Sequence, residues 1–287
     1  MTGADLVVTG SRDRPETVIV GGRIAEPGAA PTGAPTLDAA GLLVAPGFID
    51  LQCNGAAGID LSTEPERLWE MAAVLPRWGV TAWLPTIVTS PAAVRRRALA
   101  AWRAGPPPSL GGARPLATPL GLHFEGPFLA PERRGAHPPP HLAAPDAAPV
   151  ESEGWAGAVA LATLAPELPG AGDLIKALVA EGIVVSAGHS SASAREARAA
   201  VDAGVSYVTH LFNAMAPLHH REPGLAGVAL SDDRLRVGLI ADGLHVDPAM
   251  VTVAARALGD RLTLVTDAVA ALGAPPGPVP LGAQEAE

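Results

Sequence analysis

The sequence predicts an α/β protein whose main part is a (β/α)8 barrel. Short apolar runs and amphipathic stretches alternate along most of the chain, as expected for strands and helices that follow one another. The apolar runs are nearly continuous, which is typical of parallel strands buried on both faces. The chain has 287 residues and is 48% hydrophobic, enough for one barrel with a small appendage.

The beginning of the chain has a different pattern. Residues 5–9 and 17–25 predict a short antiparallel β region with a turn between its strands. The strand–helix alternation starts only at Leu42. We therefore divide the chain into a small β part, residues 1–41, and a barrel, residues 42–287.

The barrel elements follow in order along the chain. Apolar runs predict its strands near 43–51, 80–88, 118–125, 158–164, 183–189, 206–212, 236–242 and 262–267. Amphipathic stretches predict helices at 64–78, 91–104, 171–181, 193–203 and 248–258. We interpret the "RRR" of residues 95–97 as a solvated face of the second helix.

One long segment does not fit the alternation. Residues 126–156 are rich in proline and have no periodicity. The segment follows the third predicted strand, at the end of the strands where barrels place their active sites. Because a loop of this length within a compact domain is usually functional or disordered, we expect it to contribute to a site.

Composition excludes several classes of function. The net charge of −9 argues against a nucleic-acid partner. No window reaches the ~18 apolar residues of a membrane span, and the first residues do not form a secretory signal. The single cysteine, Cys53, excludes an intrachain disulfide and is consistent with the reducing cytoplasm.

Polar side chains stand at the ends of four predicted strands. These are Glu125, His189, His210 and Asp267, with Asn213 close behind. Taken singly, each would be an ordinary residue of the rim, but core packing does not require all four at successive strand ends. Glu125, His189 and His210 match a His2Glu zinc site, which keeps one position open for water. Asp267 would then be free to take a proton from that water.

The first strand carries Gln52 and Asn54 where a metallohydrolase barrel would have a His-x-His pair. Residues two apart in a strand share a face, so both amides face the barrel mouth while Cys53 faces the helices as a core thiol. Neutral amides are poor zinc ligands beside imidazoles and carboxylates. We therefore expect a single metal position, with Gln52 and Asn54 as hydrogen-bonding groups that shape the second.

Six ordered motifs, "PGFIDLQCNG", "HFEGPFLAPERRGAH", "AGHSSAS", "THLFNAM", "ADGLHVD" and "LVTDA", carry a resemblance. Together they resemble the N-acetylglucosamine-6-phosphate deacetylase family of the amidohydrolase superfamily. The resemblance runs from about Asp5 to Asp267. It implies a TIM-type metallo-dependent hydrolase barrel with a small β-sandwich part.

The resemblance also assigns roles to residues. It implies Glu125, His189 and His210 as metal ligands and Asp267 as the catalytic acid and base. Arg221 would bind the sugar phosphate, in the family across a dimer interface, and His245 would contact the substrate amide. The complete substrate-binding set that it implies is Ala136, His137, Asn213, Ala214, Arg221, Asp242 and His245.

The activity implied is hydrolysis of N-acetyl-D-glucosamine 6-phosphate to glucosamine 6-phosphate and acetate, in amino-sugar catabolism. One divalent metal per subunit is implied, Zn²⁺ first, with Fe²⁺, Mn²⁺ or Co²⁺ able to use the same ligands. The partner would be a small phosphosugar, and the full-length form would be a homodimer. N-acetylgalactosamine 6-phosphate remains an alternative substrate, which comparing rates on the two epimers would separate.

The end of the chain departs from the family pattern. The family continues past the catalytic aspartate with the last barrel helix and the remaining sandwich strands, whereas 268–287 predicts no helix. The uncovered apolar surface of the first and last strands would cost several kcal/mol at ~25 cal/mol per Å². We therefore expect poor stability, and an inactive, truncated remnant is a second hypothesis.

Overall fold

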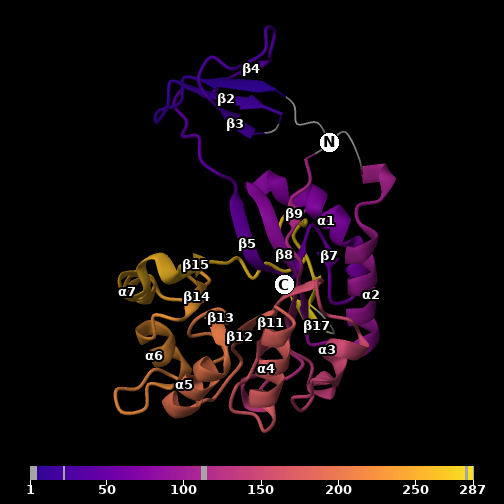
Figure 1. Cartoon of the computed structure of the whole chain (residues 1–287), viewed down its shortest axis with the longest axis vertical. Coiled ribbons are helices and arrows are strands. Elements are labelled where there is room, and N and C mark those ends of the chain that lie inside the picture. Colours follow the sequence, from indigo (N-terminus) through magenta and orange to yellow (C-terminus); the bar gives the residue numbers. More distant parts are fainter. Residues whose placement is uncertain (1–4, 22, 111–114, 282–283, 287) are drawn as a thin grey trace. The chain divides into compact units, whose positions relative to one another are not determined.

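The computed structural model describes residues 5–21, 23–110, 115–281 and 284–286. Two compact units are present, Met1–Gly47 and Phe48–Glu287. The second contains eight parallel strands that form a nearly closed barrel, as predicted, with helices around its outside (Figure 1). None of the described helices is both long and apolar enough to cross a membrane.

The first unit is a four-stranded sheet in the order β3-β2-β1-β4. The predicted antiparallel pair is confirmed by β1 (Leu6–Thr9) and β2 (Glu16–Val20). The predicted strand at 17–25 is wrong in one respect: it contains a turn, and β3 (Arg23–Ala25) pairs back on β2. A strand not predicted, β4 (Thr36–Asp38), lies parallel to β1. The outer strands expose Ile24 and Leu37, at 70% and 55%, so both edges carry apolar side chains.

The barrel strands follow the predicted order but differ in their limits. They are β5 (Phe48–Cys53), β8 (Val80–Val88), β10 (Leu122–Glu125), β11 (Val159–Leu164), β12 (Val184–Ala187), β13 (Val205–Val208), β14 (Arg236–Leu239) and β15 (Leu262–Leu264). The predicted strand 118–125 is interrupted after β9 (Thr118–Pro119), because Pro119 lacks a backbone donor and Gly121 has φ +128°. The first strand begins at Phe48 rather than at 43, directly after Pro46 and Gly47.

The last barrel strands end earlier than predicted, and the reason concerns the site. The sequence predicted strands to 189, 212 and 267, but β12, β13 and β15 stop at Ala187, Val208 and Leu264. His189, His210 and Asp267 have positive φ, of 48°, 26° and 50°, which an extended strand does not allow. The polar residues therefore lie on the turns that follow the strands.

All five predicted helices are present. They are α1 (Leu68–Val74), extended by the 3₁₀ turns η1 (Pro65–Arg67) and η2 (Leu75–Trp78), then α2 (Ala92–Ala104), α4 (Ala171–Ala180), α5 (Ala194–Ala203) and α7 (Pro248–Leu258). Ser193 and Glu196 form a capping box at the start of α5, and the Asp247 side chain caps α7. Short 3₁₀ turns elsewhere are η3 (Pro108–Leu110), η4 (Pro131–Arg133), η5 (Pro139–His141) and η6 (Gly259–Arg261).

Two helices were not predicted, α3 (Ala148–Ser152) and α6 (Gly224–Ser231). The α6 sequence, "GLAGVALS", is apolar on all sides and therefore has no amphipathic period. This composition suits a helix that is covered on both faces. A Cβ on Gly227 would lie 2.2 Å from Pro223 Cβ, so this turn of α6 requires glycine.

The barrel closes between its first and last strands only near their carboxyl ends. There, Asp267 N–H donates to the Gln52 carbonyl at 2.9 Å and Asn54 N–H to the Ala268 carbonyl at 2.8 Å. Away from this contact, the first and last strands expose apolar side chains: Phe48, Ile49 and Leu264 are 68%, 56% and 59% exposed. The sequence predicted such uncovered apolar surface on these two strands. No helix follows η6 in the described residues to 281 and 284–286; two short antiparallel strands, β16 (Val279–Leu281) and β17 (Gln284–Ala286), were not predicted.

The core has two parts. A large apolar cluster fills the space between strands and helices and includes Cys53, which is fully buried as predicted. A smaller cluster joins Leu84 of β8, Leu161 of β11 and Tyr207 of β13. This packing makes the barrel a solid support for the side chains at its mouth.

Candidate active site

Glu125, His189 and His210 converge at the carboxyl ends of β10, β12 and β13. Glu125 Oε1 lies 3.2 Å from His189 Nε2 and 3.0 Å from His210 Nε2, and the two imidazole nitrogens are 3.0 Å apart. All three residues are buried, and one ligand atom from each lies within 4.8 Å of the others. This group could hold a metal ion.

The chemistry of the three groups fits a divalent cation. His189 Nδ1 lies 2.9 Å from the Arg133 carbonyl oxygen, which can only accept a hydrogen bond. Nδ1 therefore donates to that carbonyl oxygen, and Nε2 is the ring nitrogen that faces Glu125. Burial favours the protonated carboxyl, but the hydrogen bonds from His189 and His210 outweigh it and hold the pKa of Glu125 well below its ordinary value. A buried carboxylate and imidazole lone pairs form a suitable zinc ligand set.

The two amides of the first strand contact this group from the side. Gln52 Nε2 donates to Glu125 Oε1 at 2.9 Å. Asn54 Nδ2 donates to Asp267 Oδ1 at 2.6 Å. Both contacts are of the hydrogen-bonding kind expected for these residues, while their role in shaping a second metal position stays a prediction.

Asp267 follows β15 and faces the same space. Burial and, after it, the nearby Glu125 carboxylate raise the pKa of Asp267. A carboxyl group with a raised pKa is better suited to accept and then return a proton than an ordinary surface aspartate.

Backbone strain is concentrated here. Six described non-glycine residues have positive φ, and His189, His210 and Asp267 are three of them. Such conformations cost of order 1–3 kcal/mol each and persist where the surrounding structure enforces them. Strained residues of this kind cluster at functional sites, and here they gather at the rim of the barrel.

A cavity of about 440 Å³ opens above the cluster. It is lined by five of the predicted substrate residues, Ala136, His137, Asn213, Ala214 and His245, together with Asn54, Glu125, His189, His210 and Asp267. Its apolar wall includes Val88, Ile240 and Val269, which the sequence did not single out because apolar residues beside strand ends resemble core. A cavity of this size accommodates a small molecule.

Two predicted substrate residues do not line this cavity. Asp242 instead holds His245: its Oδ2 lies 2.7 Å from His245 Nδ1, and its Oδ1 accepts the His245 backbone N–H at 2.9 Å. These hydrogen bonds lower the pKa of Asp242 to about 2, the backbone N–H of His245 being the first cause. Arg221 is exposed on the loop before α6, where its backbone N–H donates to His219 Nδ1 at 3.3 Å.

The long loop after β10 reaches the site through His137. His137 Nδ1 accepts the Thr89 backbone N–H at 3.2 Å and lies 2.8 Å from Thr89 Oγ1. Burial lowers the pKa of His137 to about 3, so its ring is neutral and Nε2 carries the proton. Nε2 lies 3.8 Å from Glu125 Oε2, so this N–H is directed toward the cluster.

Sequence reasoning did not single out one buried histidine beside the site. His123, two residues before Glu125, is fully buried between the Thr86 and Thr163 hydroxyls at 3.2 and 2.8 Å. Burial lowers the pKa of His123 to about 4, so it is neutral. The period of two along the strand places His123 on the same face as Glu125 and could have identified it.

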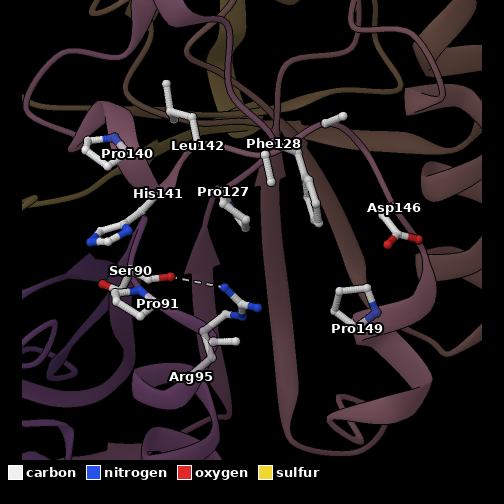
Figure 2. Close-up of a pocket in the computed structure, with 13 residues that line it drawn as sticks. Ser90, Pro91, Arg95, Pro127, Phe128, Pro140, His141, Leu142, Asp146 and Pro149 are labelled. Atoms are coloured by element: carbon white, nitrogen blue, oxygen red, sulfur yellow. Dashed lines mark hydrogen bonds between the residues drawn. The ribbon is translucent and has the colours of Figure 1, made fainter.

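A second cavity, of about 360 Å³, lies between the start of α2 and the long loop (Figure 2). Arg95 forms part of its wall, so the prediction that all of 95–97 is a solvated face is wrong for this residue. The Arg95 guanidinium donates to both Glu153 carboxylate oxygens, at 3.0 and 2.8 Å, and to the Ser90 carbonyl at 3.2 Å. Because these contacts satisfy its charge and its donors, the side chain can be buried. It therefore fastens α2 to the end of the long loop.

Comparison with known proteins was made on sequence and on structure. No protein-family model matches the sequence. The N-acetylglucosamine-6-phosphate deacetylase of Mus musculus is 43% identical over 263 residues, 87% of this chain, and the chain spans 63% of the length of that relative. An N-acetylgalactosamine-6-phosphate deacetylase of Escherichia coli O157:H7 is 39% identical over 256 residues, 85% of this chain and 65% of its own.

A solved structure gives a similar result over more of the chain. It is an aspartate-to-alanine variant of the N-acetyl-D-glucosamine-6-phosphate deacetylase of Mycobacterium smegmatis, in complex with N-acetyl-D-glucosamine-6-phosphate. It is 34% identical, superposes with a TM-score of 0.83, and the match covers 99% of this chain and 76% of the other.

Proposed function

Because this chain belongs to the N-acetylglucosamine-6-phosphate deacetylase family, we propose that it hydrolyses the acetamide of N-acetyl-D-glucosamine 6-phosphate. The products are glucosamine 6-phosphate and acetate, in amino-sugar catabolism. The observation that carries the proposal is the convergence of Glu125, His189, His210 and Asp267 on one cavity. Predicted substrate residues from three further segments line the same cavity, which supports one small-molecule site.

The cation is held by Glu125, His189 and His210. Zn²⁺ is the first choice, since two imidazoles and one carboxylate form a common catalytic zinc set, while Fe²⁺, Mn²⁺ and Co²⁺ can use the same donors. When bound, the cation supplies Lewis-acid activation of water and of the amide carbonyl.

The chain's own residues move the proton and hold the substrate. Asp267 accepts the proton of the attacking water and returns it to the amine nitrogen as the C–N bond breaks. Asn54 keeps the Asp267 carboxylate in place through the 2.6 Å hydrogen bond. His137 and His245 border the cavity and are positioned to donate to the sugar and to the amide oxygen.

We assign Arg221 to the sugar phosphate of a neighbouring subunit in a homodimer. Its exposure and its absence from the lining of the cavity in its own chain support this assignment. A guanidinium is suited to bind phosphate in a protein whose net charge is −9.

The lone cysteine, buried in the core, is consistent with a reducing cytoplasmic location.

The proposal is tested by acetate release on the purified chain, with bound metal measured alongside. Asp267→Asn is expected to lower kcat by about 10²–10⁴-fold while the metal content stays unchanged. Asp260→Asn, an exposed aspartate at the opposite end of β15, is the matched control and should keep full activity. Full activity of the Asp267 variant would refute the assignment of the acid and base.

Two alternatives have specific support. The 39% identity to the Escherichia coli N-acetylgalactosamine-6-phosphate deacetylase supports the galactosamine epimer, and faster acetate release from that epimer would favour it. The exposed apolar side chains of Phe48, Ile49 and Leu264 support the second alternative, a chain without deacetylase activity. Metal binding without acetate release from either epimer would favour this alternative.

A further inference from the structure

The Glu125 carboxylate accepts a hydrogen bond from the neutral side chain of Gln52, and Gln52 is supported by a residue with no assigned role, Thr209. Glu125 Oε1 faces both imidazoles and also accepts the Gln52 side-chain N–H at 2.9 Å. A carboxylate oxygen has two lone pairs, so one can accept from Gln52 while the other faces the two imidazoles. The Gln52 amide therefore helps to decide the direction in which Oε1 points.

Gln52 is held in turn by Thr209. A carboxylate only accepts hydrogen bonds, so Gln52 must present its NH2 to Glu125, which leaves its carbonyl oxygen facing away. The Thr209 hydroxyl donates to that carbonyl oxygen. Thr209 is 0% exposed and Gln52 is 1% exposed, so both side chains are buried and water does not replace this contact.

The packing around Thr209 fixes the direction of its hydroxyl. A Cβ placed on Gly188 would lie 2.4 Å from Thr209 Cγ2, so the methyl group packs directly against the glycine backbone. The Thr209 backbone N–H donates to the Ala187 carbonyl at 3.1 Å, which fixes the main chain. With its methyl on Gly188 and a β-branched side chain of few rotamers, Thr209 keeps its hydroxyl on Gln52.

We propose that Thr209 is a positioning residue of the metal site, acting through Gln52 on the Glu125 carboxylate. This inference rests on the metal site of the proposed function. Thr209 immediately precedes His210, so one turn of the chain supplies a ligand and also orients another. Without the hydroxyl, the buried Gln52 carbonyl has no donor, and the amide no longer holds Oε1 toward the imidazoles.

The first experiment measures the Kd for Zn²⁺ by competition with a chromophoric chelator, and the visible absorption of the Co²⁺ form. Thr209→Val keeps the shape and removes the hydroxyl; we expect binding about 10-fold weaker or more and a changed Co²⁺ spectrum. Thr209→Ser keeps the hydroxyl and should restore both. If the valine variant fails to fold, Thr209→Ala carries the same test.

Thr163→Val is the matched control. Thr163 is equally buried, its Cγ2 would lie 3.1 Å from a Cβ on Gly188, and its hydroxyl bonds to His123 instead of Gln52. Both valine variants should lose similar thermal stability, but only Thr209→Val should lose metal affinity. Equal losses of affinity in the two variants would overturn the inference, because a general packing defect would explain them.

A double-mutant cycle tests whether the effect passes through Gln52. In a Gln52→Leu background, Thr209→Val should cause no further loss of Zn²⁺ affinity, whereas two independent losses would multiply. Multiplying losses, or unchanged Zn²⁺ affinity in Thr209→Val, overturn this inference while leaving the metal site intact. A wild-type chain that binds no Zn²⁺ or Co²⁺ refutes the proposed metal site itself, and this inference with it.

Discussion

Breaking the buried ion pair between Arg95 and Glu153 is expected to destabilise the barrel strongly. The two side chains are 9% and 6% exposed. Arg95→Met leaves a group of similar length but removes all three guanidinium hydrogen bonds, including the one to the Ser90 carbonyl (Figure 2). The Glu153 carboxylate then stays buried with the Trp155 Nε1 donor, at 3.0 Å, and a distant Arg96 at 3.9 Å.

Breaking a buried pair in this way costs about 3–5 kcal/mol. In a domain of this size each kcal/mol lowers Tm by about 2–4 °C, so the expected loss is about 6–20 °C. Arg97→Met, on the same helix, is the matched control. Arg97 and its partner Glu66 are 46% and 53% exposed, so this change should cost about 1 kcal/mol or less.

Both variants are compared with the wild-type chain by calorimetry or circular dichroism melts. Replacing both partners, Arg95→Met with Glu153→Leu, should recover most of the lost stability because no charge stays buried alone. Equal shifts of Tm for Arg95→Met and Arg97→Met would refute the reasoning, since burial would then make no difference to the pair.

Three further predictions concern pH, metal and substrate. Burial raises the pKa of Asp50, so the folded chain binds the proton of this carboxyl more tightly than the unfolded chain does. The contribution of Asp50 to stability therefore falls as the pH rises from about 4, the ordinary pKa, through the raised pKa of the folded state. Asp50→Asn should flatten that part of the Tm–pH profile, and an unchanged profile would contradict the assignment. Removing the metal with a chelator should lower Tm by about 5–10 °C, because a ligand at 100 times its Kd adds about 2.7 kcal/mol; re-addition of Zn²⁺ is the control. Asp242→Asn should lower kcat/KM about tenfold by releasing His245, and should have no further effect in a His245→Ala background.

Much of the fold was predictable because its signals are local. Apolar runs and amphipathic stretches depend on residues near one another in the chain, and they gave the order of all eight barrel strands and five helices. The elements that were missed lack such a signal: α6 is apolar on every side, and β4 is three residues long. Their formation depends on neighbours that are distant in sequence.

The candidate site residues were also predictable, because a barrel brings the carboxyl ends of its strands to one rim. Glu125, His189, His210 and Asp267 each end an apolar run, so topology alone places them together. The resemblance of the motifs to a known family then indicated their chemistry.

Only the tertiary structure decided how these groups are supported. The hydrogen bonds of Thr209 to Gln52, of Thr89 to His137 and of His189 to the Arg133 carbonyl join residues between 48 and 157 positions apart. The burial of Arg95 beside the exposed Arg97 was likewise invisible in "RRR". Sequence determined which side chains reach the rim, because strand order and period are local properties. Their orientation depends on contacts across the barrel, which exist only once the strands have closed around a common core.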